Sequence, residues 1–296
     1  MKKLIATITA SALAFCAAAQ GTPAINLSVK PEREVIPTSG TKETIVQIEL
    51  NAGEAKRKRT APINLALVLD RSGSMAGTKL EKAKQAAGVA LDQLGSDDYF
   101  SLVVYDNEAE VLIAPQKVED KDALKKQIHA IRDGGGTALY AGMEKGAAQL
   151  RKFFDKEKVN RIILLSDGNA NVGPSQPGDL AKFGKELRQD GLSASTVGLG
   201  EDYNEDLMTA LAEASHANYY YVQDVEKLPG IFSEELGTVK SVVARNVKIT
   251  ITLPSGIKPC GVLGEDDITF NGQSVTIPLS DFFGSQKRRF LLSYYY

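Results

Sequence analysis

The 296-residue sequence is poor in the residue types on which many catalytic and metal sites depend. It contains only two cysteines and two histidines, and its formal net charge is −2. This near-neutral charge argues against a nucleic-acid-binding protein, which normally carries a basic face. Cys16 falls in an N-terminal segment that we expect to be removed, which leaves Cys260 alone in the mature chain. An intramolecular disulfide and a cysteine-based metal site are therefore excluded.

The N-terminal residues are typical of an export signal. Two lysines precede an uncharged, mostly apolar run over residues 4–15, and the alanines at 17–19 provide a small-residue cleavage site. The run is short for a membrane span, and no later stretch is long and apolar enough to cross a bilayer. Lipidation of Cys16 is the alternative, which the bulky Phe15 disfavours. We expect residues 1–19 to be a signal peptide and the protein to be periplasmic, extracellular or on the cell surface.

Residues 61–240 alternate between short apolar runs and amphipathic stretches. The run at 63–69 is apolar on both faces, as in a central parallel strand, and residues 78–94 follow with helical spacing and a capping box of Thr78 and Glu81. This alternation predicts an α/β domain with a doubly wound, mostly parallel sheet and one antiparallel edge strand. Further strands are expected at 99–105, 110–114, 159–166, 193–199 and 219–222, and further helices near 121–132, 139–154, 177–190, 205–215 and 225–236.

The flanking segments, residues 20–60 and 241–296, have a different pattern. Both contain runs that alternate polar and apolar residues, as half-buried strands do. Neither has enough strands for a stable sheet of its own, so together they predict a smaller β-sandwich into which the α/β domain is inserted. The last residues lie inside an expected strand, and we expect the C-terminal β segment to be incomplete. The basic run at 56–59 is interpreted as a solvated linker.

Three loops of the α/β domain carry oxygen-bearing side chains. Asp70, Ser72 and Ser74 directly follow the first central strand, Thr137 follows three glycines, and Asp167 follows another buried strand. Ligands of open parallel sheets bind at the carboxyl ends of the strands, where these three segments should meet. Oxygen-only ligands suit a hard cation such as Mg²⁺. For the first turn taken alone, the alternative is that its serines only cap the next helix.

The order Asp-x-Ser-x-Ser, then Thr after a glycine run, then Asp-Gly after a strand is complete here. It resembles the metal-ion-dependent adhesion site (MIDAS) of von Willebrand factor A (vWA) domains. The resemblance implies that Ser72, Ser74 and Thr137 bind the cation directly or nearly so, and that Asp70 and Asp167 bind it directly or through water. The flanking segments further resemble exported bacterial vWA proteins of the inter-alpha-trypsin inhibitor heavy chain type.

This resemblance implies a non-enzymatic module that binds Mg²⁺, or Mn²⁺ or Ca²⁺, and through it an Asp or Glu carboxylate of a protein partner. In relatives, ligation is coupled to movement of the last helix, here expected at 225–236. Two alternatives stay open: a scaffold in which the metal only stabilises the fold, and a metal-dependent phosphatase.

Several features disfavour catalysis and a second metal site. The sequence lacks the spacing of a phosphate loop and contains no nucleophile elbow. His129 and His216 fall on or at the end of helices, away from the expected metal edge. The acidic run at 201–206 lacks the spacing of a calcium loop, and we interpret Asn204 as the N-cap of a helix whose first turn is acidic.

Overall fold

The chain forms two compact units, which are described separately. The computed structural model describes residues 2–3, 7–13, 25–32, 35–36, 43–53, 61–201, 203–264, 267–279 and 281–295. One unit is continuous in sequence and comprises Thr60–Lys240, whereas the other combines the two flanks, Met1–Arg59 and Ser241–Tyr296. The basic run at 56–59 and the expected cleavage site at 17–19 lie outside the described residues.

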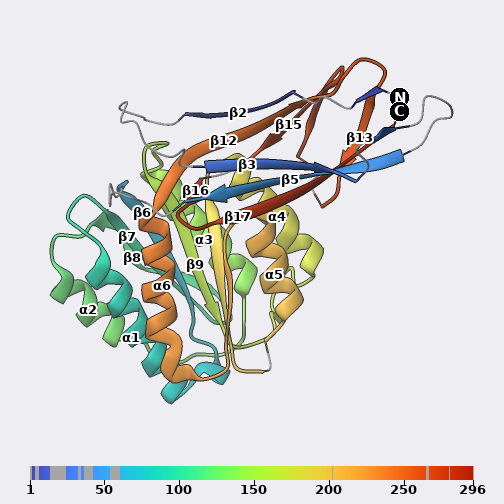
Figure 1. Ribbon diagram of the computed structural model, residues 1–296. Helices are drawn as coiled ribbons and strands as arrows, with labels where there is room; N and C mark the ends of the chain where they lie inside the picture. The colour runs from blue at the N-terminus through green and yellow to red at the C-terminus, as the bar shows by residue number, and fades with distance from the viewer. Residues whose placement is uncertain are drawn as a thin grey trace. The chain divides into compact units, whose positions relative to one another are not determined.

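A six-stranded sheet in the order β11-β10-β9-β6-β7-β8 is the centre of the α/β unit (Figure 1). All neighbouring strands are parallel except β7 and β8, which form the antiparallel edge. The predicted doubly wound, mostly parallel sheet is therefore confirmed. The strands are β6 (Ile63–Asp70), β7 (Tyr99–Tyr105), β8 (Ala109–Lys117), β9 (Val159–Ser166), β10 (Ser193–Leu199) and β11 (Tyr219–Val222).

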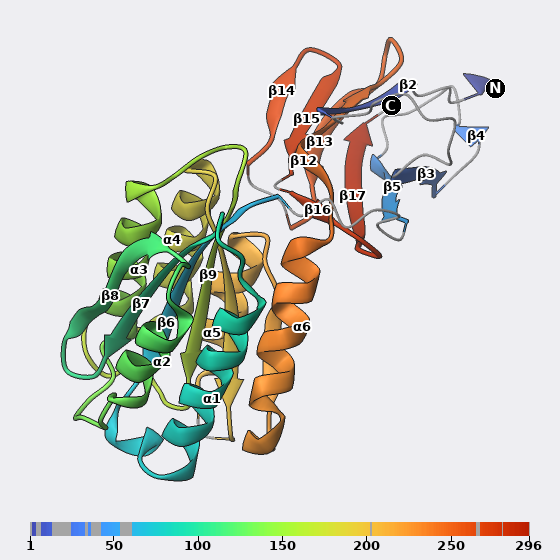
Figure 2. The ribbon, with the colours of Figure 1, turned by 90° about the vertical axis from the view of Figure 1, so that its left-hand side faces the viewer.

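Helices cover both faces of this sheet, which explains why β6 and β9 are buried at every position. In Figures 1 and 2, α1, α2 and α6 lie on one face, and α3, α4 and α5 pack on the other. The helices are α1 (Thr78–Gln93), α2 (Lys121–His129), α3 (Leu139–Lys152), α4 (Pro177–Gln189), α5 (Glu205–Ala214) and α6 (Leu228–Lys240), with short 3-10 helices η1 (Gly73–Met75) and η2 (Val225–Lys227).

Two expectations about helix ends have different outcomes. Asn204 is the N-cap of α5, and its side chain accepts a 3.0 Å hydrogen bond from the backbone N–H of Leu207, as predicted. The predicted capping box of Thr78 and Glu81 is wrong. Gly77, with a φ of 78°, takes the N-cap position of α1, and Glu81 instead contacts Lys84 at 2.7 Å. The positive φ suits glycine because it has no Cβ.

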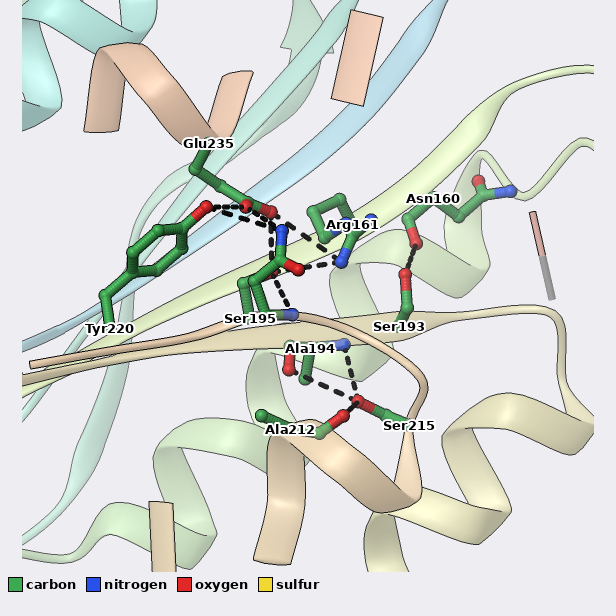
Figure 3. A network of polar contacts seen from close by, with 10 residues as sticks. Asn160, Arg161, Ser193, Ala194, Ser195, Ala212, Ser215, Tyr220 and Glu235 are labelled. Carbon is green, nitrogen blue, oxygen red and sulfur yellow. Dashed lines mark hydrogen bonds and ion pairs between the residues drawn. The ribbon is translucent and has the colours of Figure 1, made fainter. Parts of the chain in front are cut away.

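A buried carboxylate joins α6 to the sheet (Figure 3). Glu235 is 0% exposed and accepts hydrogen bonds from the Ser195 hydroxyl at 2.5 Å, the Asn218 amide at 2.7 Å and the Tyr220 hydroxyl at 2.9 Å. The guanidinium of Arg161 lies 3.6 Å from Oε1 of Glu235. Three strands, β9, β10 and β11, or the loops before them, therefore hold one side chain of the last helix.

In the second unit, two larger antiparallel sheets share one hydrophobic core, so the predicted β-sandwich of the two flanks is confirmed. One sheet has the order β13-β17-β5-β3, and the other has the order β14-β15-β12-β16 with β2 also paired to β12. The strands of the first sheet are β3 (Ile25–Pro31), β5 (Glu43–Ala52), β13 (Lys258–Val262) and β17 (Lys287–Tyr295). Those of the second are β2 (Thr7–Leu13), β12 (Val242–Thr252), β14 (Thr269–Asn271), β15 (Ser274–Pro278) and β16 (Phe282–Phe283).

Strand β2 lies within the segment that we expect to be a signal peptide. It pairs antiparallel with β12, from Thr7 opposite Thr252 to Leu13 opposite Arg245. A further two-residue pair joins β1 (Lys2–Lys3) to β4 (Val35–Ile36). Cleavage after residue 19 would remove β1 and β2 from these pairings. Among the described residues, no helix combines the length and apolar character needed to cross a bilayer.

Candidate metal centre

Successive strands are added on one side of β6 and then on its other side, and the candidate site lies where this strand order switches. From β6 the chain runs to β7 and β8 on one side, and then returns to β9 on the other side of β6. Strands β6 and β9 are parallel, with Leu69 opposite Leu165, so they end side by side. Asp70 is the last residue of β6, and Asp167 directly follows β9. Ligand sites in open α/β sheets lie at such a switch point.

The structure brings the five predicted residues together at this edge. We call Asp70, Ser72, Ser74, Thr137 and Asp167 the candidate metal centre. Asp70 and Asp167 are 0% and 1% exposed, Ser72 and Thr137 are also buried, and Ser74 is exposed. Two carboxylates therefore lie below the surface, and one hydroxyl reaches it.

Short hydrogen bonds link the first turn to both carboxylates. The Ser72 N–H donates to Oδ1 of Asp70 at 2.8 Å, and the Ser74 hydroxyl donates to Oδ1 of Asp167 at 2.7 Å. The Ser72 and Ser74 hydroxyl oxygens lie 3.0 Å apart. Neither serine caps a helix with its side chain, since η1 has no side-chain cap and Gly77 caps α1. Their oxygens face the carboxylates instead.

The glycine run holds Thr137 beside this turn. The Gly73 N–H donates to the Gly135 carbonyl at 2.9 Å, and the Gly136 N–H donates to the Asn107 side chain at 2.9 Å. A Cβ added at Gly136 would lie 2.7 Å from Oδ1 of Asn107, so the Asn107 side chain would have to shift out of this hydrogen bond. A Cβ on Gly168 would lie 3.5 Å from Oγ of Ser74 and 3.8 Å from Oγ1 of Thr137. The two hydroxyls therefore converge over Gly168.

Sequence reasoning missed three residues that support the site. The Ser166 hydroxyl donates to Oδ2 of Asp70 at 2.7 Å, and the Asn171 side chain accepts from the Thr137 N–H at 2.8 Å. Nζ of Lys79 lies 2.5 Å from Oδ2 of Asp167. The position of Ser166 next to Asp167 was a usable signal. No sequence signal indicates the other two contacts. The Asn171 contact depends on how its loop folds, and the Lys79 contact depends on where its long side chain reaches.

Burial raises the pKa of the Asp70 carboxyl, and the negative charge of Asp167 adds to this effect. Hydrogen bonds from Ser72 and Ser166 act in the opposite direction. A bound dication would favour the ionised carboxylate again. Within the described ranges there is no cluster of three or more His, Cys, Asp or Glu side chains able to hold a metal. The donor set here is two carboxylates and three hydroxyls, which fits a hard, oxygen-binding cation.

The two histidines do not join this group. His129 is exposed at the end of α2. His216 precedes β11, at the opposite edge of the sheet, where it contacts Nη1 of Arg188 at 2.6 Å. The last two acids of the run at 201–206, Glu205 and Asp206, lie in the first turn of α5, and Asn204 acts there as the N-cap.

Comparisons with known proteins agree on the type of domain. A family model described as the von Willebrand factor type A domain matches residues 64–234. The chain is 29% identical over 264 residues to the Synechocystis protein sll0103, a match that covers 86% of this chain and 62% of that protein. Human inter-alpha-trypsin inhibitor heavy chain H2 is 28% identical over 196 residues, covering 63% of this chain and 21% of that protein. The chain thus spans less than two thirds of these relatives.

Solved structures share the fold. A von Willebrand factor type A protein from Catenulispora acidiphila has a TM-score of 0.73 at 21% identity, covering 95% of this chain and 67% of that chain. Proximal thread matrix protein 1 from the mussel byssus, solved with a zinc-occupied MIDAS motif, has a TM-score of 0.52 at 22% identity, covering 65% and 47%. The predicted resemblance, to both bacterial and inter-alpha-trypsin inhibitor relatives, is confirmed.

Proposed function

Because the chain belongs to the von Willebrand factor type A domain family, we propose that its α/β unit binds a divalent cation at the candidate metal centre and uses it to bind a partner protein. Proteins of this family are generally non-enzymatic interaction modules, and we assign the same class to this chain. The observation that carries the proposal is the convergence of two buried carboxylates and three hydroxyls at one sheet edge.

The charges of the site favour a cation. Asp70 and Asp167 are both buried, and within the described part of the chain Lys79 makes the one ion pair with the site. Two carboxylates that are buried close together are destabilised unless their charge is compensated, and a dication compensates it. The three hydroxyls can help to bind this dication. We propose Mg²⁺, with Mn²⁺ and Ca²⁺ as alternatives. The zinc found in the mussel protein supports a divalent ion at this type of site.

The proposed ligand on the partner is an Asp or Glu side chain. When bound, the cation supplies an electrophilic centre that attracts an oxygen anion. Asp167 accepts from the Ser74 hydroxyl, and the Ser72 hydroxyl oxygen lies 3.0 Å from that of Ser74, so the two oxygens converge on one spot. Because Ser74 is exposed, a partner can reach the site. Protein–protein interaction is a general property of vWA domains, whereas the acidic residue is our proposal for this chain.

We further propose that the protein acts outside the cytoplasm. Residues 1–19 would serve as the signal peptide, residues 61–240 as the binding domain, and residues 20–60 with 241–296 as the β-sandwich that presents it. Supporting this order, the sheets of the second unit take strands from both flanks of the α/β unit.

A pull-down from the envelope fraction of the native organism tests the function. Wild-type protein should capture the same partner with Mg²⁺ and lose it with chelator, and Asp70→Ala should capture none. A variant at an exposed acid away from the site, Glu234→Ala, should behave like wild type. Mg²⁺-independent capture, or no partner together with a large fall in melting temperature on chelation, would favour the scaffold role instead.

A further inference from the structure

One basic side chain of the chain itself reaches the candidate metal centre. Nζ of Lys79 lies 2.5 Å from Oδ2 of Asp167. The other carboxylate oxygen, Oδ1, accepts the hydrogen bond from Ser74. The Lys79 side chain is 35% exposed, whereas that of Asp167 is fully buried. The ammonium group therefore stands at the rim, between the buried carboxylate and solvent.

Helix geometry alone does not explain a lysine at this position. Lys79 is the second residue of α1, and the N-terminal turn of a helix disfavours positive charge. Arg71, the other basic residue of this segment, is engaged elsewhere, since its guanidinium contacts Asp106 at 2.9 Å and Glu110 at 3.3 Å. The ion pair with Asp167 is thus what stabilises Lys79 where it lies.

The charge of Lys79 makes the cation-loaded site positive rather than neutral. Two carboxylates and one ammonium group leave a net charge of about −1 before a cation binds, and about +1 once a dication is present. Without Lys79 the loaded site would be roughly neutral. A net positive charge attracts an anionic ligand and discriminates against an uncharged one.

We propose that Lys79 is a specificity-determining residue that pairs with Asp167 before the cation binds and with the partner's carboxylate afterwards. This inference rests on the proposed function. It predicts two effects of opposite direction. Removing the positive charge should strengthen cation binding, because Asp167 no longer has to leave an ion pair and the dication no longer faces an ammonium group. The same change should weaken carboxylate binding.

The test uses Mn²⁺ alone as the cation probe and acetate as the carboxylate probe. The concentration of free Mn²⁺ is measured by electron paramagnetic resonance, which gives the Kd for Mn²⁺. Acetate binding to the Mn²⁺-loaded protein is followed by water-proton relaxation, with acetamide as the uncharged control. Lys79→Gln removes the charge but keeps a hydrogen-bond donor, and Lys79→Arg keeps the charge. Lys82→Gln is the matched control on the same helix, where Lys82 contacts Glu226 at 2.7 Å.

We expect Lys79→Gln to lower the Kd for Mn²⁺ by about fivefold and to raise the Kd for acetate by a similar factor. Lys79→Arg and Lys82→Gln should stay near wild type in both measurements. The inference is overturned if Lys79→Gln moves both constants in the same direction or leaves acetate binding unchanged while wild type binds Mn²⁺. If wild type itself binds no Mn²⁺, the proposed function fails as well. Lys79→Met provides a second neutral variant should Lys79→Gln not fold.

Discussion

The hydroxyl of Ser74 donates a 2.7 Å hydrogen bond to Asp167, which is 93 positions away in the sequence. Parallel pairing of β6 with β9 creates this contact, because both strands end at the same edge and each is followed by one of the two residues. The oxygens of the candidate metal centre are thus positioned by the sheet rather than by one local motif. Several consequences of this arrangement are measurable.

Substitution of Asp70 should strongly weaken cation binding. Asp70→Asn keeps the shape of the side chain and an acceptor for Ser166, but removes a negative charge from the centre of the site. We expect the affinity for Mg²⁺ to fall by at least about 100-fold, measured by isothermal titration calorimetry. Asp224→Asn, which changes an exposed acid at the N-cap of η2, should leave the affinity unchanged. Equal affinities for wild type and Asp70→Asn would contradict the assignment.

The glycine run before Thr137 should be sensitive to a single methyl group. In Gly136→Ala, the new Cβ would push the Asn107 side chain away, so the loop that carries Thr137 would lose the hydrogen bond from the Gly136 N–H to Asn107. We expect weaker Mg²⁺ binding by about tenfold. Gly88→Ala offers a comparison, because nothing lies within 4 Å of its added Cβ inside α1. That variant should bind Mg²⁺ normally and gain about 0.5–1 kcal/mol in unfolding free energy, measured in urea.

The buried network of Glu235 should dominate the stability of α6. Glu235→Ala removes the carboxylate that faces the Arg161 guanidinium, and we expect a loss of about 3–5 kcal/mol in unfolding free energy. Tyr220→Phe removes one hydrogen bond to Glu235 and should cost about 1 kcal/mol. Glu234→Ala, at the exposed neighbouring position, should stay within about 0.5 kcal/mol of wild type. Similar losses for Glu234 and Glu235 would show that the network contributes little.

Movement of α6 when the cation is ligated stays a prediction, and the network around Glu235 would oppose it. A shift of α6 must break or carry with it the contacts of Glu235 with Ser195 and Asn218. Tyr220→Phe removes a third contact of Glu235, the hydrogen bond from the Tyr220 hydroxyl, and should therefore ease any such movement. Hydrogen exchange of α6 amides with and without Mg²⁺ would detect it.

Glu49 in the β-sandwich predicts an acid-sensitive contribution to stability. The Asn51 side chain donates to it, and contacts with Lys287 at 3.0 Å and Arg289 at 3.2 Å act in the same direction, so the pKa of Glu49 falls from 4.5 to about 2. Since the folded pKa is below the unfolded one, this stabilisation is present above pH 4.5 and is lost as the pH falls towards 2. Thermal unfolding of Glu49→Gln should depend less on pH in this window. An unchanged pH profile would contradict this role.

Export should leave a defined N-terminus. We expect mass spectrometry of the protein recovered from the envelope to show a chain that begins at Gln20, after cleavage behind Ala19. A chain that still begins at Met1 would contradict the signal peptide, and a lipid-modified Cys16 would favour the alternative.

Much of the fold could be predicted because its main determinants are local. The runs that form β6 and β9 are apolar on both faces, and in the structure every residue of both strands is buried. Most of the candidate site could also be predicted, since Asp70, Ser72, Ser74 and Asp167 follow strands β6 and β9, whose direction the alternation of elements fixes. Thr137 follows no strand, and its signal was the glycine run before it. The start of α1 was mispredicted because Gly77, with its positive φ, takes the position that the pattern gave to Thr78.

Contacts between distant side chains could not be predicted in the same way. Lys79 and Asp167 are 88 positions apart, and Arg161 and Ser195 are 34 positions apart in sequence, yet each pair is in contact. Nothing in their local sequence indicates a partner, because the first contact arises only when α1 packs on the sheet and the second only when β9 pairs with β10. The later beginning of α6, at Leu228 instead of residue 225, has a local cause, since Val225–Lys227 forms a separate 3-10 turn before it.

An anomalous difference map recorded at the manganese edge, from crystals of the protein soaked in MnCl₂, would locate the bound cation directly. We expect one strong peak per chain, bounded by the oxygens of Ser72, Ser74 and Thr137 with Asp70 and Asp167 beside them, and no such peak in Asp70→Asn. Absence of a peak in wild type, or a peak elsewhere on the chain, would contradict this expectation.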